Sequence, residues 1–191
     1  FGIGNAYLQI GVLLFTQKQY KDAIENFTYS LKEFETLNDT YRVSMLTYLI
    51  GNTQIELSDF YAARSNLEKA IKLKTALHDR QGELECNIAL AKLLFQTNEL
   101  SAAQKLYYQC LSTVKQDGIS EGVVIINIGL SKILILQDSL QKAETLLIEA
   151  LGICERLNFV YRKVAVLNEL KNFYQLTKSY ETAFTYQAEY Y

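Results

Sequence analysis

The sequence contains no proline, nine glycines and a single histidine among its 191 residues. An all-β domain of this length needs many turn residues, so their scarcity favours helix throughout. The single histidine, His78, stands between two apolar blocks and shares no helix face with a serine or cysteine, which argues against a catalytic triad. We therefore expect no catalytic residues, and the chain is not expected to be an enzyme.

The three cysteines are too widely spaced for a zinc or redox site. Cys86, Cys110 and Cys154 form no CxxC pattern, and a single histidine adds little to a ligand set. Cysteine is among the residue types most often buried, so we expect three free buried thiols, which favour a reducing compartment. We expect no metal, no cofactor and a cytoplasmic location, with the periplasm as the alternative if the parent protein is a membrane sensor.

Charge of either sign is sparse and evenly spread. Nineteen basic and twenty-one acidic residues give a formal net charge of -2, without a long run of one sign. Nucleic-acid binding needs a basic footprint, so direct binding of DNA or RNA is not expected. The most apolar stretch, residues 122–136, contains Asn127 and Lys132 and is shorter than the roughly 20 residues that span a bilayer. We expect a buried helix there and no membrane insertion by this segment.

The sequence repeats itself every forty residues without a gap. One column of equivalent positions holds alanine in every repeat: Ala23, Ala63, Ala103, Ala143 and Ala183. A second column is small in four repeats and reads Gly11, Gly51, Ala91, Ser131 and Lys171. Three residues before each alanine of the first column stands a bulky side chain, namely Tyr20, Phe60, Leu100, Leu140 and Tyr180.

The spacing of these columns predicts helical hairpins. Intervals of three, four and seven residues are those of an α-helix, and two such blocks occur in each repeat. Small residues recur where two helices cross closely, because a larger side chain would push the backbones apart. A single hairpin buries its apolar faces only by stacking on its neighbours. The predicted fold is all-α, a right-handed α-α superhelix (solenoid) of about five antiparallel helix pairs.

The first repeat resembles the tetratricopeptide repeat. The resemblance rests on Tyr7, Ile10, Gly11, Leu14, Tyr20, Ala23, Phe27 and Ser30. It covers essentially the whole chain and is weaker in the fifth repeat, where Lys171 replaces a small residue. The usual repeat has about 34 residues and often ends in proline, so this one is similar to the long-repeat branch in bacterial signalling proteins. We expect a single solenoid domain, a fragment of a longer chain, with repeats at about 4–43, 44–83, 84–123, 124–163 and 164–191.

The resemblance implies that the first helix of every hairpin lines a concave surface, where a peptide or protein ligand lies. Equivalent positions on that helix give six candidate groove residues, namely Tyr48, Asn52, Lys92, Lys132, Asn168 and Asn172. An asparagine amide both donates to and accepts from a peptide backbone, and a lysine attracts a carboxylate. The alternative is that these side chains simply face solvent in a wide groove.

The resemblance further implies a sensory or scaffolding module of a larger bacterial regulator, such as a two-component kinase, a transcription factor or a cyclase. One alternative is a structural module for homo-oligomerisation through a tyrosine-rich C-terminal surface. Its candidate residues are Tyr174, Tyr180, Tyr186, Tyr190 and Tyr191. A second alternative is an activity like that of a response-regulator phosphatase, which would need segments absent here.

Overall fold

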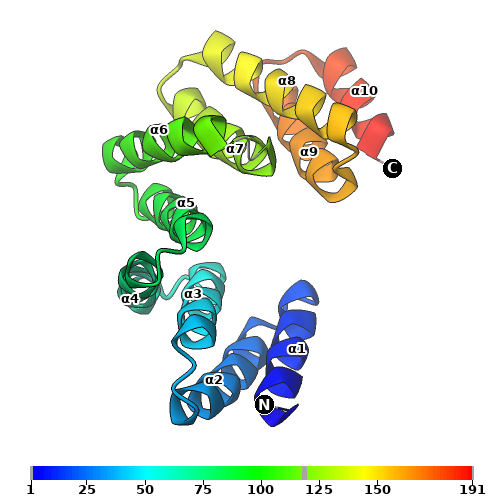
Figure 1. The fold of residues 1–191 in the computed structure, drawn as a ribbon. Helices are drawn as coiled ribbons and strands as arrows, with labels where there is room; N and C mark the ends of the chain where they lie inside the picture. The colour runs from blue at the N-terminus through cyan, green and yellow to red at the C-terminus, as the bar shows by residue number, and fades with distance from the viewer. Residues whose placement is uncertain (1, 118–119, 191) are drawn as a thin grey trace. The chain divides into compact units, whose positions relative to one another are not determined.

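Only α-helices occur as regular elements in the residues that the structure, a computed structural model, describes (Figure 1). These are residues 2–117 and 120–190, with side chains described for 2–116 and 121–189. The helices are α1 (Gly2–Thr16), α2 (Tyr20–Thr36), α3 (Thr40–Glu56), α4 (Phe60–Ala76), α5 (Arg80–Gln96), α6 (Leu100–Asp117), α7 (Ser120–Leu136), α8 (Leu140–Leu157), α9 (Val160–Leu176) and α10 (Tyr180–Tyr190). The predicted all-α fold is confirmed for this part of the chain.

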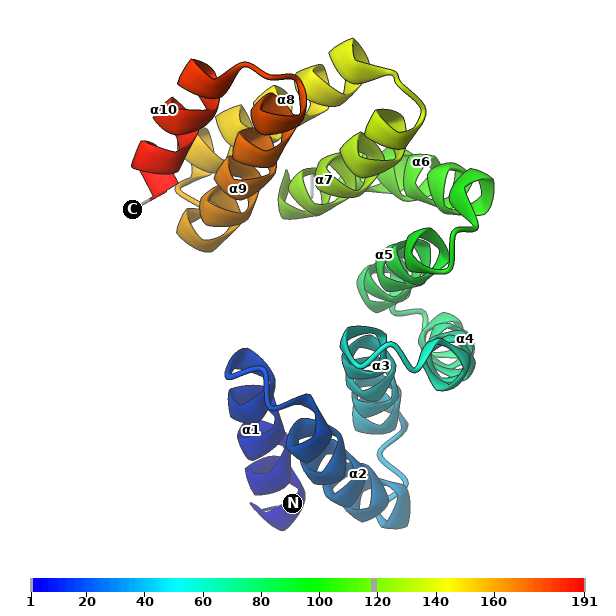
Figure 2. The same ribbon diagram turned by 180° about the vertical axis from the view of Figure 1, so that it is seen from behind.

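The helices fall into two compact units. Unit 1, Phe1–Glu99, contains α1 to α5; α1 pairs with α2 and α3 with α4, while α2 packs on α3 and α4 on α5 (Figure 2). Unit 2, Leu100–Tyr191, contains α6 to α10; α7 pairs with α8 and α9 with α10, while α6 packs on α7 and α8 on α9. In both units a second helix such as α2 or α8 therefore packs between its own first helix and the first helix of the next hairpin.

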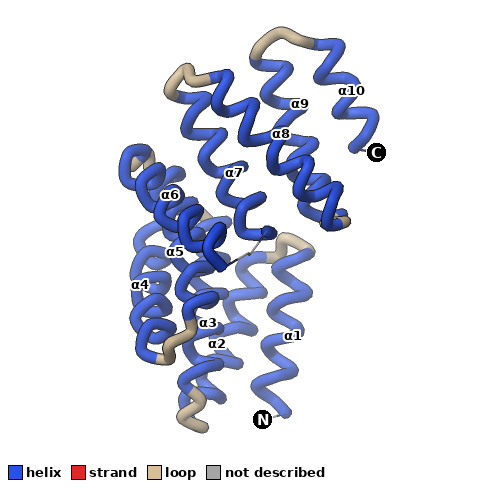
Figure 3. The backbone as a smooth tube through the Cα atoms, turned by 45° about the horizontal axis from the view of Figure 1, so that its top comes forward, coloured by secondary structure: helices blue, strands red, loops and turns tan. Residues whose placement is uncertain are grey.

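Every described turn between helices contains one residue in the left-handed backbone region. Figure 3 shows these turns as short loops. The left-handed residues are Lys18, Asn38, Ser58, His78, Asn98, Asp138, Asn158 and Lys178, each with φ between 53° and 63°. The residue after each of them donates its N–H to a carbonyl in the last turn of the preceding helix, as Asp39 does to Phe34 at 3.0 Å. Residues 118–119, between α6 and α7, lie outside the described residues.

Aspartates cap the helices that follow three of these turns. The side chains of Asp39, Asp59 and Asp79 accept the backbone N–H of Arg42, Ala62 and Gly82. Such a bond satisfies one of the free N–H groups at a helix start. The first helices α3, α5, α7 and α9 begin at residues 40, 80, 120 and 160. The repeat boundaries expected at 44, 84, 124 and 164 therefore fall inside these helices.

The alanine column lies at the centre of the helix packing. Ala23, Ala63, Ala103 and Ala143 are fully buried and Ala183 is 3% exposed. Gly11, Gly51 and Ala91 of the second small column are buried as well. A Cβ atom added at Gly11 would lie 2.6 Å from the ring of Phe27, itself only 1% exposed, and 3.3 Å from the carbonyl oxygen of Ala23. α1 and α2 therefore cross closely at Gly11, where a larger residue would require the Phe27 ring to move.

All three cysteines are free and buried, which confirms the sequence-based expectation. Burial disfavours the thiolate, and it raises the pKa of Cys86 to about 12 and that of Cys110 to about 11.

None of the helices in the described ranges is long and apolar enough to cross a bilayer.

Replacing Gly11 by alanine is expected to lower the free energy of unfolding. Overpacking against a buried ring costs about 1–3 kcal/mol, and the gain in helix propensity offsets less than about 1 kcal/mol of it. Urea unfolding followed by circular dichroism measures the difference. The control is Gly152→Ala in α8, where an added Cβ meets nothing within 4 Å and where we expect a gain of up to about 1 kcal/mol. Equal stability of Gly11→Ala and the parent chain would contradict the close crossing.

Candidate functional site

The six candidate groove residues all lie on first helices of the hairpins. Tyr48 and Asn52 lie on α3, Lys92 on α5, Lys132 on α7, and Asn168 and Asn172 on α9. Asn172 is exposed and the other five are half-buried. The first three belong to unit 1 and the last three to unit 2, so each unit carries its own part of the predicted surface.

Both lysines of the predicted surface are already paired with carboxylates. Lys92 Nζ on α5 donates to Glu56 Oε1 on α3, and Lys132 Nζ on α7 lies 2.7 Å from Glu169 Oε1 on α9. Each pair therefore joins two neighbouring first helices of one unit. An acidic ligand would have to displace a carboxylate of the chain itself, so the lysines are weaker anion sites than their column suggested.

The asparagines of the predicted surface differ from the lysines. In the described part of the chain, the side-chain amides of Asn52, Asn168 and Asn172 have no hydrogen-bond partner. Asn66, on a second helix, instead donates to Gln54 at 2.8 Å. Asn168 and Asn172 are one helical turn apart and so project from the same face of α9. These amides remain available to bond an incoming backbone.

A pocket of about 430 Å³ opens among the first helices of unit 1. Its walls are mostly apolar, and its lining residues are Leu8, Gln9, Val12, Met45, Tyr48, Leu49, Lys74, Gly82 and Glu85. Three successive first helices, α1, α3 and α5, contribute all of these residues except Lys74, which comes from the end of α4. Of the six candidates from the sequence, only Tyr48 lines this pocket.

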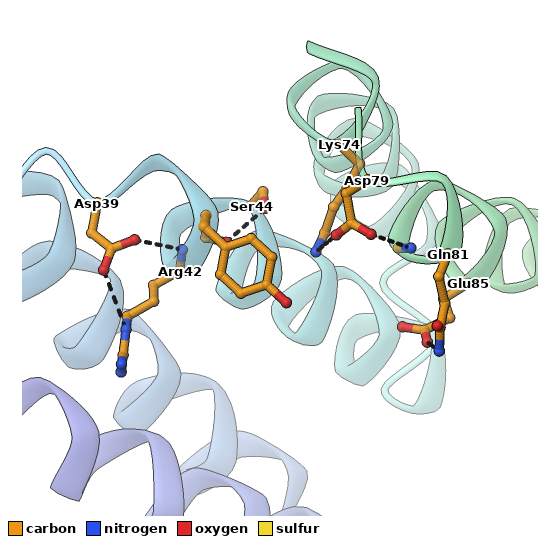
Figure 4. A network of polar contacts seen from close by, with 9 residues as sticks. Asp39, Arg42, Ser44, Lys74, Asp79, Gln81 and Glu85 are labelled. Atoms are coloured by element: carbon orange, nitrogen blue, oxygen red, sulfur yellow. Dashed lines mark hydrogen bonds and ion pairs between the residues drawn. The ribbon is translucent and has the colours of Figure 1, made fainter. Parts of the chain in front are cut away.

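The floor of the pocket includes a buried lysine that the sequence analysis missed. The side chain of Lys74 is 7% exposed, and its Nζ atom lies 2.7 Å from Asp79 Oδ2 and 4.8 Å from the centre of the Tyr41 ring (Figure 4). Asp79 also accepts the N–H of Gly82 at 2.9 Å. Bonding to Lys74 and to this N–H holds the pKa of Asp79 below its usual value. Lys74 thus ties the end of α4 to the start of α5.

Gly82 makes room for the buried lysine. A Cβ atom at this position would lie 2.5 Å from Asp79 Oδ2 and 2.7 Å from both Cδ and Nζ of Lys74. At the equivalent positions of the first junction the order is reversed, because the apolar Phe34 stands in place of the lysine and Arg42 in place of the glycine. The guanidinium of Arg42 lies 4.8 Å from the centre of the Phe34 ring. At both of these junctions a cation lies beside an aromatic ring, and the cation and the ring come from different helices.

The second large pocket, of about 600 Å³, lies in unit 2 at the start of α9. Its lining includes Glu121 and Arg162, which pair at 2.8 Å, and Tyr161, which is 93% exposed.

Some of the C-terminal tyrosines pack inside the fifth hairpin, because the rings of Tyr174 and Tyr186 stack 5.5 Å apart. Tyr180 is 66% exposed, and the side chains of Tyr190 and Tyr191 lie outside the described residues.

No group of three or more histidine, cysteine, aspartate or glutamate residues in the described ranges is placed to hold a metal ion. The polar geometry of the first helices consists of ion pairs within each unit, free amides and mostly apolar pocket walls. Such a surface offers hydrogen bonds and apolar contacts to a ligand.

Comparison with known proteins agrees with this architecture. A family model described as a tetratricopeptide repeat matches residues 47–76, which include most of α3 and all of α4. Comparison with curated proteins gave no match. Among solved structures, the chain is similar to a Rap protein complexed with Competence and Sporulation Factor (TM-score 0.87, 16% identity, 96% of this chain and 52% of that one).

Two further solved structures are similar. One is NprR in complex with its cognate peptide NprX (TM-score 0.83, 15% identity, 96% of this chain and 53% of that one). The other is a signal transduction ATPase with numerous domains from Pyrococcus horikoshii, which has a tetratricopeptide repeat sensor (TM-score 0.75, 18% identity, 98% of this chain and 28% of that one). This chain spans about half the length of the first two proteins and less of the third. The likenesses show the fold, a helical solenoid of tetratricopeptide-type repeats, and confirm the predicted resemblance.

Replacing Asp79 by asparagine is expected to lower the free energy of unfolding by about 3 kcal/mol, because it leaves the buried ammonium of Lys74 without its carboxylate. The matched control is Asp59→Asn. Asp59 caps α4 in the same way but pairs with no cation in the described residues, and asparagine caps a helix equally well. Denaturant unfolding of both variants checks this, and equal losses would contradict a role for the ion pair.

The pKa of Asp79 is lowered on folding, so the contribution of Asp79 to the free energy of unfolding depends on pH. This contribution is complete above about pH 4 and is lost as the pH falls further.

Proposed function

We propose that this chain is a peptide- or protein-binding module that holds an extended segment of its ligand against the first helices of its hairpins. The observation that carries this proposal is the set of free asparagine amides at Asn52, Asn168 and Asn172. An extended peptide presents one N–H and one carbonyl per residue, and an asparagine amide matches both groups. Backbone bonds of this kind bind a segment without fixing its sequence.

The sequence preference then comes from the other groups on the same face. Lys92 and Lys132 are neutralised by Glu56 and Glu169, so they contribute little net attraction for an acidic ligand. Their aliphatic stems and the neighbouring apolar residues offer contact area instead. We propose that they hold adjacent first helices in register rather than bind a carboxylate.

We further propose that the module is the sensory or scaffolding part of a larger regulator, without catalytic activity of its own. Support comes from the solved proteins to which it is similar. Two of them were determined with bound factors or peptides, and the third has a tetratricopeptide repeat sensor joined to an ATPase. Each of these proteins is longer than this chain.

The test is selection from a random dodecapeptide display library on the immobilised chain, followed by titration of the enriched peptides in solution. We expect each enriched peptide to bind about twofold or more weakly either to Asn52→Ala, in unit 1, or to the double variant Asn168→Ala, Asn172→Ala, in unit 2, because each lost hydrogen bond costs about 0.5–1.5 kcal/mol. Fluorescence anisotropy measures the affinities.

The control is Asn26→Ala on the second helix α2, whose amide donates to the carbonyl of Asp22 at 2.8 Å in its own helix. This variant should bind the peptides as the parent does. Two outcomes would overturn the proposal, namely a library without enriched peptides and unchanged affinity of the enriched peptides for both Asn52→Ala and the double variant. Lys92→Glu and Lys132→Glu do not test ligand binding alone, because each change also places like charges beside Glu56 or Glu169 within the chain.

A further inference from the structure

The pocket of about 430 Å³ in unit 1 has a chemistry that specifies part of a ligand. We propose that it is a subsite for one bulky aliphatic side chain of a peptide, and that a basic residue next to this side chain in the peptide pairs with Glu85. The inference rests on the proposed function, because it concerns a ligand held by the same first helices. It adds which ligand residues are selected and by which groups of this chain.

The walls of the pocket favour an aliphatic occupant. Leu8, Met45 and Leu49 present only apolar surface, and Val12, which is 39% exposed, continues it at α1. Its volume is at the lower end of the range for small-ligand sites, which suits one large side chain and the backbone beside it. Met45 is the only methionine of the chain, and a flexible thioether adapts to occupants of different shape.

The charges of the lining select against an acidic occupant. Lys74 is the only cationic residue of the lining, and Asp79 compensates its charge at 2.7 Å. Lys92, which follows the pocket residue Glu85 by about two turns of α5, donates to Glu56 on α3. An acidic ligand would have to break one of these pairs to find a partner.

Glu85 is the carboxylate of the pocket that has no cation. In the described residues its side chain accepts a hydrogen bond from Gln81 at 3.3 Å and forms no ion pair (Figure 4). Glu85 is exposed, so a ligand reaches it without moving the helices. The lining therefore carries one uncompensated negative charge beside an apolar cavity, and the complementary ligand is an aliphatic residue adjacent to lysine or arginine.

The first experiment compares what the parent chain and Glu85→Lys select from the random dodecapeptide library. The parent should enrich peptides with leucine, isoleucine or methionine beside lysine or arginine, and Glu85→Lys should lose that basic preference. For one such peptide, titrated against both chains, we expect about a tenfold or larger loss of affinity with Glu85→Lys, since like charges are juxtaposed. Glu85→Gln should lose about two- to fivefold, the usual contribution of an exposed ion pair.

The matched control is Glu68→Lys. Glu68 is exposed on the second helix α4. The Glu68→Lys variant should therefore bind the same peptide as the parent does. A pocket-filling variant, Val12→Trp, should bind at least about tenfold more weakly, because the aliphatic side chain stays in water. Circular dichroism of each variant establishes that it folds before its affinity is interpreted.

The second experiment places the peptide in the pocket. Labelling with methyl-13C methionine gives a single protein methyl resonance, that of Met45, which should shift in proportion to the occupancy measured by anisotropy. Peptides that bind without moving this resonance, or without a basic preference, would overturn the subsite and leave peptide binding intact. A library with no enriched peptide would instead overturn the proposed function itself.

Discussion

Neighbouring helices cross closely at the alanine column, and the geometry of the hairpins follows from that crossing. Four of the five alanines are fully buried and the fifth is 3% exposed, so a larger residue there would overpack the crossing. The column recurs every forty residues, and each described turn returns the chain with a single left-handed residue. Equivalent first helices within one unit, such as α1 and α3 or α7 and α9, therefore repeat the same crossing.

Polar groups on that face follow a simple division. Cations are neutralised by carboxylates of the neighbouring first helix, as in Lys92 with Glu56 and Lys132 with Glu169. Amides are left without partners, as in Asn168 and Asn172. The ion pairs strengthen the stacking of hairpins only modestly, because they are partly exposed. They also remove net charge from this face, on which amides and apolar side chains remain.

Most of the fold could be predicted from the sequence, because its signals are local and regularly spaced. The alanine column, the second small column and the helical period together predict hairpins. The positions of the helix starts were less visible, because they depend on the left-handed residue and on capping aspartates such as Asp79, and apolar columns do not mark them.

The site could be predicted only in part. That Asn52 and Lys92 lie on first helices follows from the period, but the carboxylate partner of Lys92 depends on the register between α3 and α5, which no local pattern contains. Lys74 left a signal in the sequence, since it stands in a column that otherwise reads Phe34, Val114 and Cys154. Its burial followed only once the turn had placed Asp79 beside its ammonium group.

Peptide binding at the first helices is tested by following the side-chain amide resonances of the asparagines by NMR during titration with a selected peptide. The NH2 signals of Asn52, Asn168 or Asn172 are expected to shift until the peptide saturates the chain. The signals of Asn66 and Asn127, whose amides already donate to Gln54 and to Glu149, should stay in place. Shifts confined to Asn66 and Asn127 would contradict peptide binding at the first helices.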